Sequence, residues 1–401
     1  MEEKKYKKNF FLGVVNGILM NFVDAITGSS TVLPLYLSSI TSSSILIGFG
    51  SSLYNFLWPL PQLFTAYFLE GKKRKKFLYD ITAYIRFFAI LFMAFLIFKN
   101  PKNILPLFLF SMFVYHISGG IAGLPFMDIV GRTIPSTKQH LFWGLRISIG
   151  GFLSILGGVL IKFILSKYNF PTNFSLLYFI ASIFVGIGLY SFCLVNEPDD
   201  IERKVNRDFL KFLKNGFSTI LKDKMFTTLF SLRILTGISL ALEPFFMVYV
   251  VKVLNMRVEI TGILISLRMA GLLISNFLWD YIQKKKSLKY LFVISSIVGS
   301  LIPIIAYLSS QKHFLIFLLF FLNGIFYSGV QVASPSLLLT ISPSGKRETY
   351  IGFYNTLLSP IYLFPVINGM IIDNLSFNFA FLLSFLVSVM SFLLSLKLRK
   401  L

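Results

Sequence analysis

Apolar residues along this chain come in long runs, separated by short polar or basic connections. A helix needs about 20 apolar residues to cross a bilayer, and about twelve runs meet that length. The runs cover roughly residues 10–37, 44–69, 77–98, 104–128, 141–166, 174–195, 225–251, 258–282, 288–309, 313–340, 350–372 and 376–396. Because backbone groups in lipid must be satisfied within their own segment, every run is expected to be a helix. The pattern predicts an all-α membrane protein with about 12 transmembrane helices.

The composition agrees with a lipid environment. Hydrophobic residues make up 55% of the 401 residues and charged residues 14%, whereas soluble domains carry about 25% charged residues. The net charge of +21 could suggest nucleic-acid binding. The basic residues, however, lie in short clusters between apolar runs, which indicates contact with membrane lipids of the anionic inner leaflet and no nucleic-acid partner.

The basic clusters also predict the topology. Residues 1–8 are basic and precede a run too long for the apolar part of a signal peptide, so this run is expected to stay as the first membrane helix. Most of the 38 Lys and Arg residues fall in the tails and connections that share a side with the N-terminus. The positive-inside rule therefore predicts a multi-pass protein of the inner (cytoplasmic) membrane with both termini cytoplasmic.

The longest polar segment divides the runs into six and six. We expect an N-terminal six-helix bundle at 1–196, a cytoplasmic central linker at 197–224 and a C-terminal six-helix bundle at 225–401. The linker is basic and partly amphipathic, so it is expected to lie on the membrane surface, with a regulatory role as the alternative.

The two expected bundles are related in sequence. Residues 135–144 follow the fourth run and residues 343–352 follow the tenth, with Pro, Ser, Lys and Gly in register. Pro34 in the first run matches Pro244 in the seventh. A duplicated half predicts two pseudo-symmetric bundles that rock around a site near the midplane.

Two further patterns point to a family. An acid is followed by paired lysines after the second run, at Glu70, and after the eighth, at Asp280; the fourth run carries His116 and Gly120. These features resemble the major facilitator superfamily, with the loop signature G-x-x-x-D-R-x-G-x-R-R and the helix-four signature R-x-x-x-G, here with histidine for arginine. The resemblance implies a permease that works by alternating access.

The resemblance also implies a cytoplasmic gate. In the family, opposite charges at the cytoplasmic rim form a latch that breaks when the bundles rock. The corresponding rim residues here are Glu70, Asp128, Arg132 and Asp280.

Ionisable and polar residues inside the runs are the candidates for substrate or coupling contact, because such groups are costly in lipid. They are Asp24, His116, Glu243, Arg233, Arg268, Asn21, Asn323, Tyr327 and Gln331. Asn21 and Asp24 share a small, polar stripe of the first run. Asp24 is expected to carry a proton or cation or to oppose a substrate charge, with a structural ion pair or a hydrogen-bonded carboxyl as the alternative. His116 is either a proton relay or a packing residue.

The second half offers its own candidates. Glu243 precedes Pro244, where a kink frees a backbone carbonyl. Either Arg233 or Arg268 is expected to pair with Glu243 or with an anionic substrate. Asn323, Tyr327 and Gln331 lie at i, i+4 and i+8, a stripe that lines a cavity or joins helices by hydrogen bonds.

Enzyme motifs are absent from the sequence. It contains no phosphate-binding loop, nucleophile elbow or zinc-protease motif, and Cys193 is its single cysteine. We therefore expect no enzyme activity, cofactor or metal. The expected function is secondary active transport of a small-molecule substrate, with H⁺ and Na⁺ as the candidate coupling ions. A non-transporting membrane receptor or assembly subunit on the same scaffold is the alternative, and a lipid enzyme is a more distant one.

Overall fold

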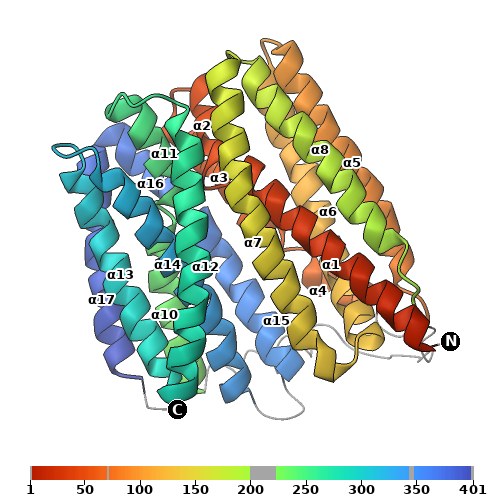
Figure 1. The fold of residues 1–401 in the computed structure, drawn as a ribbon. Helices are drawn as coiled ribbons and strands as arrows, with labels where there is room; N and C mark the ends of the chain where they lie inside the picture. Colours follow the sequence, from red (N-terminus) through yellow and green to blue (C-terminus); the bar gives the residue numbers. More distant parts are fainter. Residues whose placement is uncertain (1, 70–71, 199–222, 343–346, 399–401) are drawn as a thin grey trace. The chain divides into compact units, whose positions relative to one another are not determined.

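A computed structural model describes residues 2–69, 72–198, 223–342 and 347–398. All regular secondary structure in these residues is helical, which confirms the all-α fold class. In the first half the helices are α1 (Glu2–Thr27), α2 (Val32–Ile40), α3 (Ser44–Leu57), α4 (Gln62–Leu69), α5 (Lys76–Lys99), α6 (Ile104–Thr133), α7 (Ser136–Lys167) and α8 (Thr172–Cys193). They are labelled in Figure 1.

The second half has the same character. Its helices are α10 (Lys224–Leu240), α11 (Glu243–Val248), the π-helix η1 (Tyr249–Val253), α12 (Ile260–Lys285), α13 (Leu288–Leu308), α14 (Leu315–Ile341), α15 (Arg347–Leu358), the 3-10 helix η2 (Ser359–Leu363), α16 (Phe364–Asn374) and α17 (Phe377–Leu396). In the described part of the chain, 11 helical segments are long and apolar enough to cross a membrane. The helix α3 adds a shorter apolar segment at the expected second position.

Four of the expected spans are interrupted, which the apolar runs did not reveal. The first turns at Gly28, whose carbonyl accepts hydrogen bonds from the amides of Thr31 and Leu33. The second ends as α3 before Pro59 and resumes as α4 after Pro61, because proline lacks the N–H that continues a helix. The seventh and eleventh spans break in the same way, at 241–242 and around η2.

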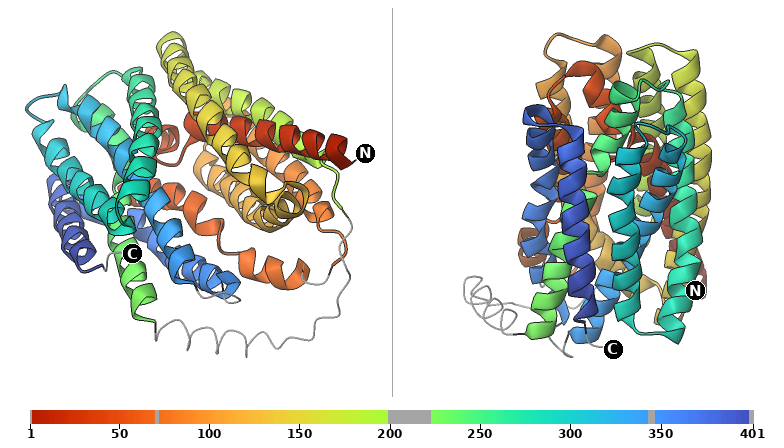
Figure 2. Two further views of the ribbon diagram at one scale, coloured as in Figure 1. Left: turned by 60° about the horizontal axis from the view of Figure 1, so that its bottom comes forward. Right: turned by 90° about the vertical axis from the view of Figure 1, so that its left-hand side faces the viewer.

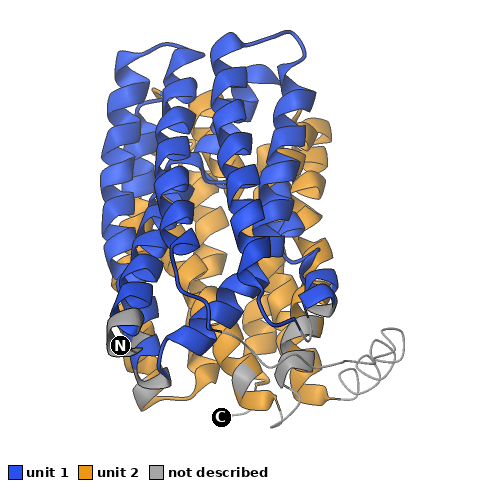
Figure 3. Ribbon diagram, turned by 90° about the vertical axis from the view of Figure 1, so that its right-hand side faces the viewer, with its two compact units in different colours: residues 1–41, 53–205, 258–266 blue, residues 42–52, 206–257, 267–401 orange. Residues whose placement is uncertain are grey.

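The helices divide into two compact units, coloured separately in Figure 3. Unit 1 contains residues 1–41, 53–205 and 258–266. In it, α1 packs on α7 and α8, and α5 packs on α6 and α8 (Figure 2). Its core includes an aromatic cluster in which the Tyr36 ring lies 4.8 Å from Phe108, 5.4 Å from Phe174 and 6.2 Å from Tyr178.

Unit 2 contains residues 42–52, 206–257 and 267–401. In it, α13 packs on α14 and α17, and α10 packs on α14 and α17. Phe226, Trp279, Phe292 and Tyr354 are among the buried side chains of its core.

Large apolar side chains also lie on the outside of the helices. Phe277 is 79% exposed, Phe110 65% and Phe88 62%. Soluble monomers rarely expose apolar surface of this extent. These exposed apolar faces are therefore suited to contact with lipid.

Some predicted features lie outside the described residues. They are Glu70, positions 199–222 of the expected linker and positions 343–346 of the sequence repeat. The expected division into bundles at 1–196 and 225–401 stays a prediction.

Candidate functional site

An acidic centre lies within unit 1 where α1, α3 and α5 meet. Asp24 on α1 is half-buried. Its hydrogen-bond partner is the Tyr54 side chain of α3, and Arg86 of α5 is the nearby cation. Arg86 in turn donates from Nη2 to the hydroxyl of Tyr115 at 3.4 Å. The sequence singled out Asp24, but the two tyrosines that surround it carry no sequence signal beyond their position in apolar runs.

His116 reaches this centre through an aromatic contact. Its ring lies 4.9 Å from the ring of Tyr54 and 5.0 Å from that of Tyr115, both edge-on. Tyr54 therefore touches both His116 and Asp24. The arrangement suits either a relay or a packing histidine, so the predicted role of His116 stays a prediction.

Asn21 lies at a helix contact. Its Nδ2 donates to the carbonyl of Gly17 at 2.8 Å and to that of Arg146 on α7 at 3.3 Å. Arg146 itself donates to the carbonyl of Gly13. The amide of Asn21 is thus satisfied by backbone oxygens in the described structure, which joins α1 to α7.

Unit 2 contains a buried ion pair on α11 and α12. The Nε of Arg268 donates to Oε1 of Glu243 at 2.6 Å and to Oδ1 of Asn323 at 3.0 Å. The side chains are 6%, 8% and 2% exposed, respectively. The guanidinium also lies 5.0 Å from the ring centre of Tyr327. The sequence predicted Arg233 or Arg268 as the partner of Glu243, and in the structure that partner is Arg268.

The polar stripe of α14 is partly gathered at this pair. Asn323 binds Arg268 directly, and Tyr327 lies under its guanidinium. Gln331 is exposed and donates from Nε2 to the Tyr327 hydroxyl at 3.0 Å. The stripe therefore runs from the buried ion pair to an exposed amide.

Arg233 on α10 has a different environment. It is 8% exposed, and its Nη2 donates to the hydroxyl of Tyr362 at 3.4 Å. Tyr354 and Tyr327 are its other polar neighbours.

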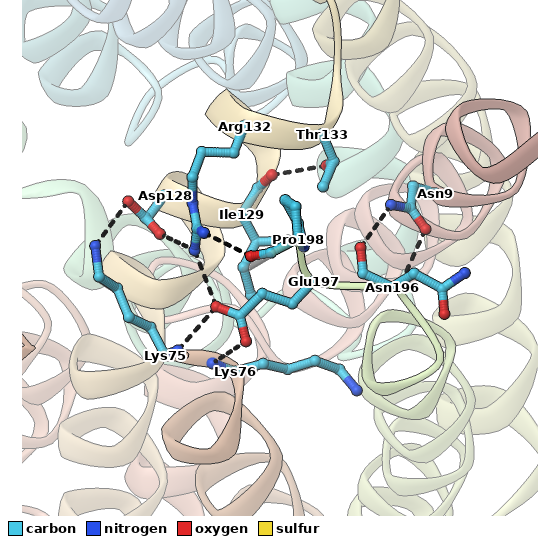
Figure 4. A network of polar contacts seen from close by, with 10 residues as sticks. All are labelled: Asn9, Lys75, Lys76, Asp128, Ile129, Arg132, Thr133, Asn196, Glu197 and Pro198. Atoms are coloured by element: carbon cyan, nitrogen blue, oxygen red, sulfur yellow. Dashed lines mark hydrogen bonds and ion pairs between the residues drawn. The ribbon is translucent and has the colours of Figure 1, made fainter. Parts of the chain in front are cut away.

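Two of the predicted rim residues belong to a charge network, drawn in Figure 4. Asp128 accepts from Lys75 at 3.0 Å and from Arg132 at 2.5 Å. Arg132 also donates to Oε1 of Glu197 at 2.9 Å. Of the other predicted rim residues, Asp280 is exposed on α12 and Glu70 lies outside the described residues.

Glu197 completes this network and was missed as a site residue. Its carboxylate accepts the backbone amides of Lys75 at 2.8 Å and Lys76 at 3.1 Å, besides the Arg132 bond. It therefore fixes the start of α5 to the end of α6. The sequence showed it only as the first acid of the expected linker.

Replacing Glu197 by Gln is expected to speed amide exchange at Lys75 and Lys76. A hydrogen bond to a charged group contributes about 1.5–3 kcal/mol, and 1.4 kcal/mol is about tenfold in an equilibrium. Exchange at the two amides should therefore rise by about tenfold or more, as measured by hydrogen–deuterium exchange.

Asp80→Asn is the matched control. Asp80 pairs with Lys76 at 3.5 Å, with side chains 32% and 22% exposed. Such pairs contribute about 0–1 kcal/mol, so exchange should change little. Equal exchange rates in the two variants would show that Glu197 does not hold this segment.

Within each unit, a close helix contact joins segments from the two sequence halves. Within unit 2, a Cβ on Gly48 of α3 would lie 2.7 Å from the carbonyl carbon of Pro365, at the start of α16. At the other end of α16, Asp373 accepts the amides of Ser44 at 3.0 Å and Ile45 at 3.2 Å. The carboxylate thereby satisfies two of the free N–H groups at the start of α3.

Within unit 1, α7 and the start of α12 make a similar contact. A Cβ on Gly158 would meet the side chain of Ser266 and would lie 2.5 Å from the carbonyl of Gly262. Ser266 donates to the carbonyl of Ile155 at 3.0 Å. Small residues allow backbones to approach this closely.

The described residues contain no group of three or more side chains able to hold a metal ion. The centres described in the two units are built from carboxylates, guanidinium groups, amides and hydroxyls. Such groups form hydrogen bonds with polar solutes, and the carboxylates exchange protons.

The sequence matches a known protein family. Residues 10–359 and 229–401 match the family model described as Major Facilitator Superfamily. Among curated protein sequences there is no match.

Solved transporter structures share the fold. A variant of the nucleoside transporter NupG has a TM-score of 0.75 at 12% identity, over 96% of this chain and 99% of that chain. The xylose transporter XylE from E. coli, partially occluded and inward open, has a TM-score of 0.72 at 12% identity, over 99% and 98%. A POT family transporter in complex with 5-aminolevulinic acid has a TM-score of 0.73 at 12% identity, over 98% and 95%.

These TM-scores show a shared fold. The family model covers the chain almost from end to end. The chain therefore belongs to the major facilitator superfamily of membrane transporters.

Proposed function

We propose that the protein is a secondary active transporter that moves a small solute across the inner membrane by alternating access. The observation that carries this proposal is the buried Glu243–Arg268 pair inside the spans of unit 2. Charged groups within spans are costly and tend to serve substrate or ion movement. The solved structures with the same fold are transporters of nucleosides, xylose and other small solutes.

The carboxylates of Asp24 and Glu243 are the coupling groups. Asp24 has a tyrosine and an arginine as neighbours, and Glu243 has an arginine and an amide. When Glu243 takes up a proton, it loses its charge, and the ion pair is replaced by weaker bonds from the Arg268 guanidinium to an uncharged carboxyl. Arg268 then becomes available to a solute or to a rearranged α12. His116 serves as a relay beside Asp24, and Na⁺ is the alternative coupling ion.

The helix contact at Gly48 in unit 2 and that at Gly158 in unit 1 each act as a gate. The packing of α3 on α16 and of α7 on the start of α12 is closed in the described structure, and each contact opens when access alternates. The network of Asp128, Arg132 and Glu197 acts on the cytoplasmic side, together with Asp280 and Glu70. Both termini and the 197–224 linker are cytoplasmic in this scheme, and the two six-helix bundles are 1–196 and 225–401.

Proteoliposomes that enclose a pH-sensitive dye test the coupling. A broad panel of small solutes is added to vesicles with the wild-type protein, beside Asp24→Asn and Glu243→Gln. We expect at least one solute to change the internal pH in the wild type. Both variants should reduce that change by at least about tenfold, since removal of a catalytic proton carrier costs about 10²–10⁴-fold.

Two results would count against the coupling groups. A solute-dependent pH change of wild-type size in both variants would remove Asp24 and Glu243 from proton transfer. A solute flux without any pH change, but dependent on a sodium gradient, would assign coupling to Na⁺.

A further inference from the structure

Arg233 is a buried cation whose charge the described structure does not balance. Its guanidinium lies within the α10 span and is 8% exposed. Arginine stays protonated in proteins, and an unpaired ion in a low-dielectric interior costs several kcal/mol. A buried guanidinium without an opposing charge therefore indicates a missing partner.

Its polar neighbours are tyrosines. The Nη2 bond to the Tyr362 hydroxyl, at 3.4 Å, lies beyond the usual range for a strong hydrogen bond. Tyr354 and Tyr327 are also nearby. Of the side chains that the structure describes, none is a carboxylate paired with Arg233. Glu243, the nearby acid of this unit, is bound to Arg268.

Two buried hydroxyls beside Arg233 lack a well-formed hydrogen bond. The hydroxyl of Tyr354 lies close enough to Ser334 and Arg233 to interact with both. Neither Tyr354 Oη nor Ser334 Oγ reaches the distance and angle of a hydrogen bond within the described residues, although the residues are 5% and 2% exposed. A buried hydroxyl whose hydrogen bond is not made costs about 1–3 kcal/mol. The packing of α10, α14 and α15 on one another thus gathers a cation and two hydroxyls that are poorly bonded.

The other arginines within the spans have partners. Arg268 binds Glu243, and Arg86 lies near Asp24 and bonds to a tyrosine. Arg146 lies 4.9–5.2 Å from three aromatic rings and donates to the carbonyl of Gly13. Arg233 differs from all three in having neither a carboxylate nor a backbone oxygen as a described partner.

We propose that Arg233, Tyr354 and Ser334 bind an anionic group of the transported solute, a carboxylate or a phosphate. The guanidinium offers parallel N–H donors that match either group, and its charge is balanced only by an anion. The two hydroxyls donate to the remaining oxygens. This inference rests on the proposed transport function and names its substrate class. A neutral or cationic solute would leave the charge of Arg233 unbalanced.

Ligand-induced stabilisation of the purified protein tests this without any flux measurement. The unfolding midpoint is measured in detergent with increasing sodium phosphate, acetate, succinate or glutamate, against sodium chloride at equal ionic strength. A ligand that binds only the folded protein stabilises it by RT ln(1 + [L]/Kd), so the midpoint rises with the logarithm of the ligand concentration once this exceeds Kd. We expect at least one of the four anions to raise the unfolding midpoint of the wild type. Comparing the effect of phosphate with the effects of the three carboxylates then identifies the chemical group that binds.

The variants locate the binding. A hydrogen bond to a charged group contributes about 1.5–3 kcal/mol, so Tyr354→Phe should weaken the apparent affinity by about tenfold or more. Arg233→Gln should weaken the apparent affinity further. The apparent affinity of Arg233→Lys should lie between those of Tyr354→Phe and Arg233→Gln. Tyr36→Phe is the matched control, because Tyr36 is fully buried and its hydroxyl is also unpartnered, but aromatic rings surround it. Its affinity should equal that of the wild type.

The inference is overturned if none of the four anions stabilises the wild type, or if Tyr354→Phe and Arg233→Gln keep the wild-type affinity. The two proposals fail separately. Flux of a neutral or cationic solute that Arg233→Gln leaves unchanged would keep the transport function and overturn the anion site. Anion binding lost in the variants, but without flux in any assay, would keep the anion site and overturn transport.

Discussion

Replacing Glu243 by Ala should lower the free energy of unfolding by about 3–5 kcal/mol, because it leaves a buried arginine without its partner. Arg268 is 6% exposed and bonds to Glu243 through both Nε and Nη2. Asn323 remains as a neutral acceptor at 3.0 Å, but it cannot balance the charge. Chemical unfolding in mixed micelles measures the loss.

A double-mutant cycle separates this pair from general damage to the core. Glu243→Gln and Arg268→Gln are each expected to destabilise, whereas the double variant removes both charges together. Contacting residues in such networks show coupling energies of about 0.5–3 kcal/mol, and this pair should lie at the upper end. Additive losses in the double variant would mean that the ion pair does not stabilise the fold.

Replacing Gly158 by Val should slow solute flux strongly while the protein still folds. The new Cβ would meet Ser266 and lie 2.5 Å from the carbonyl of Gly262, where backbone must move. Overpacking costs about 1–3 kcal/mol, and a bias of that size shifts a two-state equilibrium by about 5–150-fold. The closed contact between α7 and α12 should therefore be depopulated, with a comparable fall in the flux of labelled solute into proteoliposomes.

Gly144→Val on the same helix is the matched control. Gly144 lies on α7 as well, but a Cβ there would meet nothing within 4 Å. Both changes place a β-branched residue in one helix and so carry a similar propensity cost. Equal flux in the two variants would show that the α7–α12 contact takes no part in the transport cycle.

The fold was predictable because membrane spans depend on a local property, the length of an apolar run. The family resemblance, read from Glu70, Asp280 and His116, is confirmed by the family model, and with it a transporter rather than an enzyme. The breaks at 28–31 and 58–61 were missed. Apolar residues flank both breaks, so the length and mean hydropathy of the whole run do not register them.

The site was predictable only as a list of residues. The cost of a charge in lipid is enough to single out Asp24 and Glu243. Which arginine pairs with Glu243 depends on how α10 and α12 are rotated, and a single sequence contains no measure of that rotation. For the same reason Tyr54 and Glu197 were not recognised, since their roles come from partners distant in the sequence.

Counterflow in proteoliposomes tests the central claim most directly. Vesicles are loaded with a solute found in the pH-dye panel, at high concentration and unlabelled, and are diluted into a trace of the same solute carrying a label. A carrier with one site that alternates between the two sides exchanges inner solute for outer label, so we predict a transient accumulation of label above its external concentration. Simple equilibration of the label, or none at all, would contradict alternating access and would favour a channel or a receptor on this scaffold.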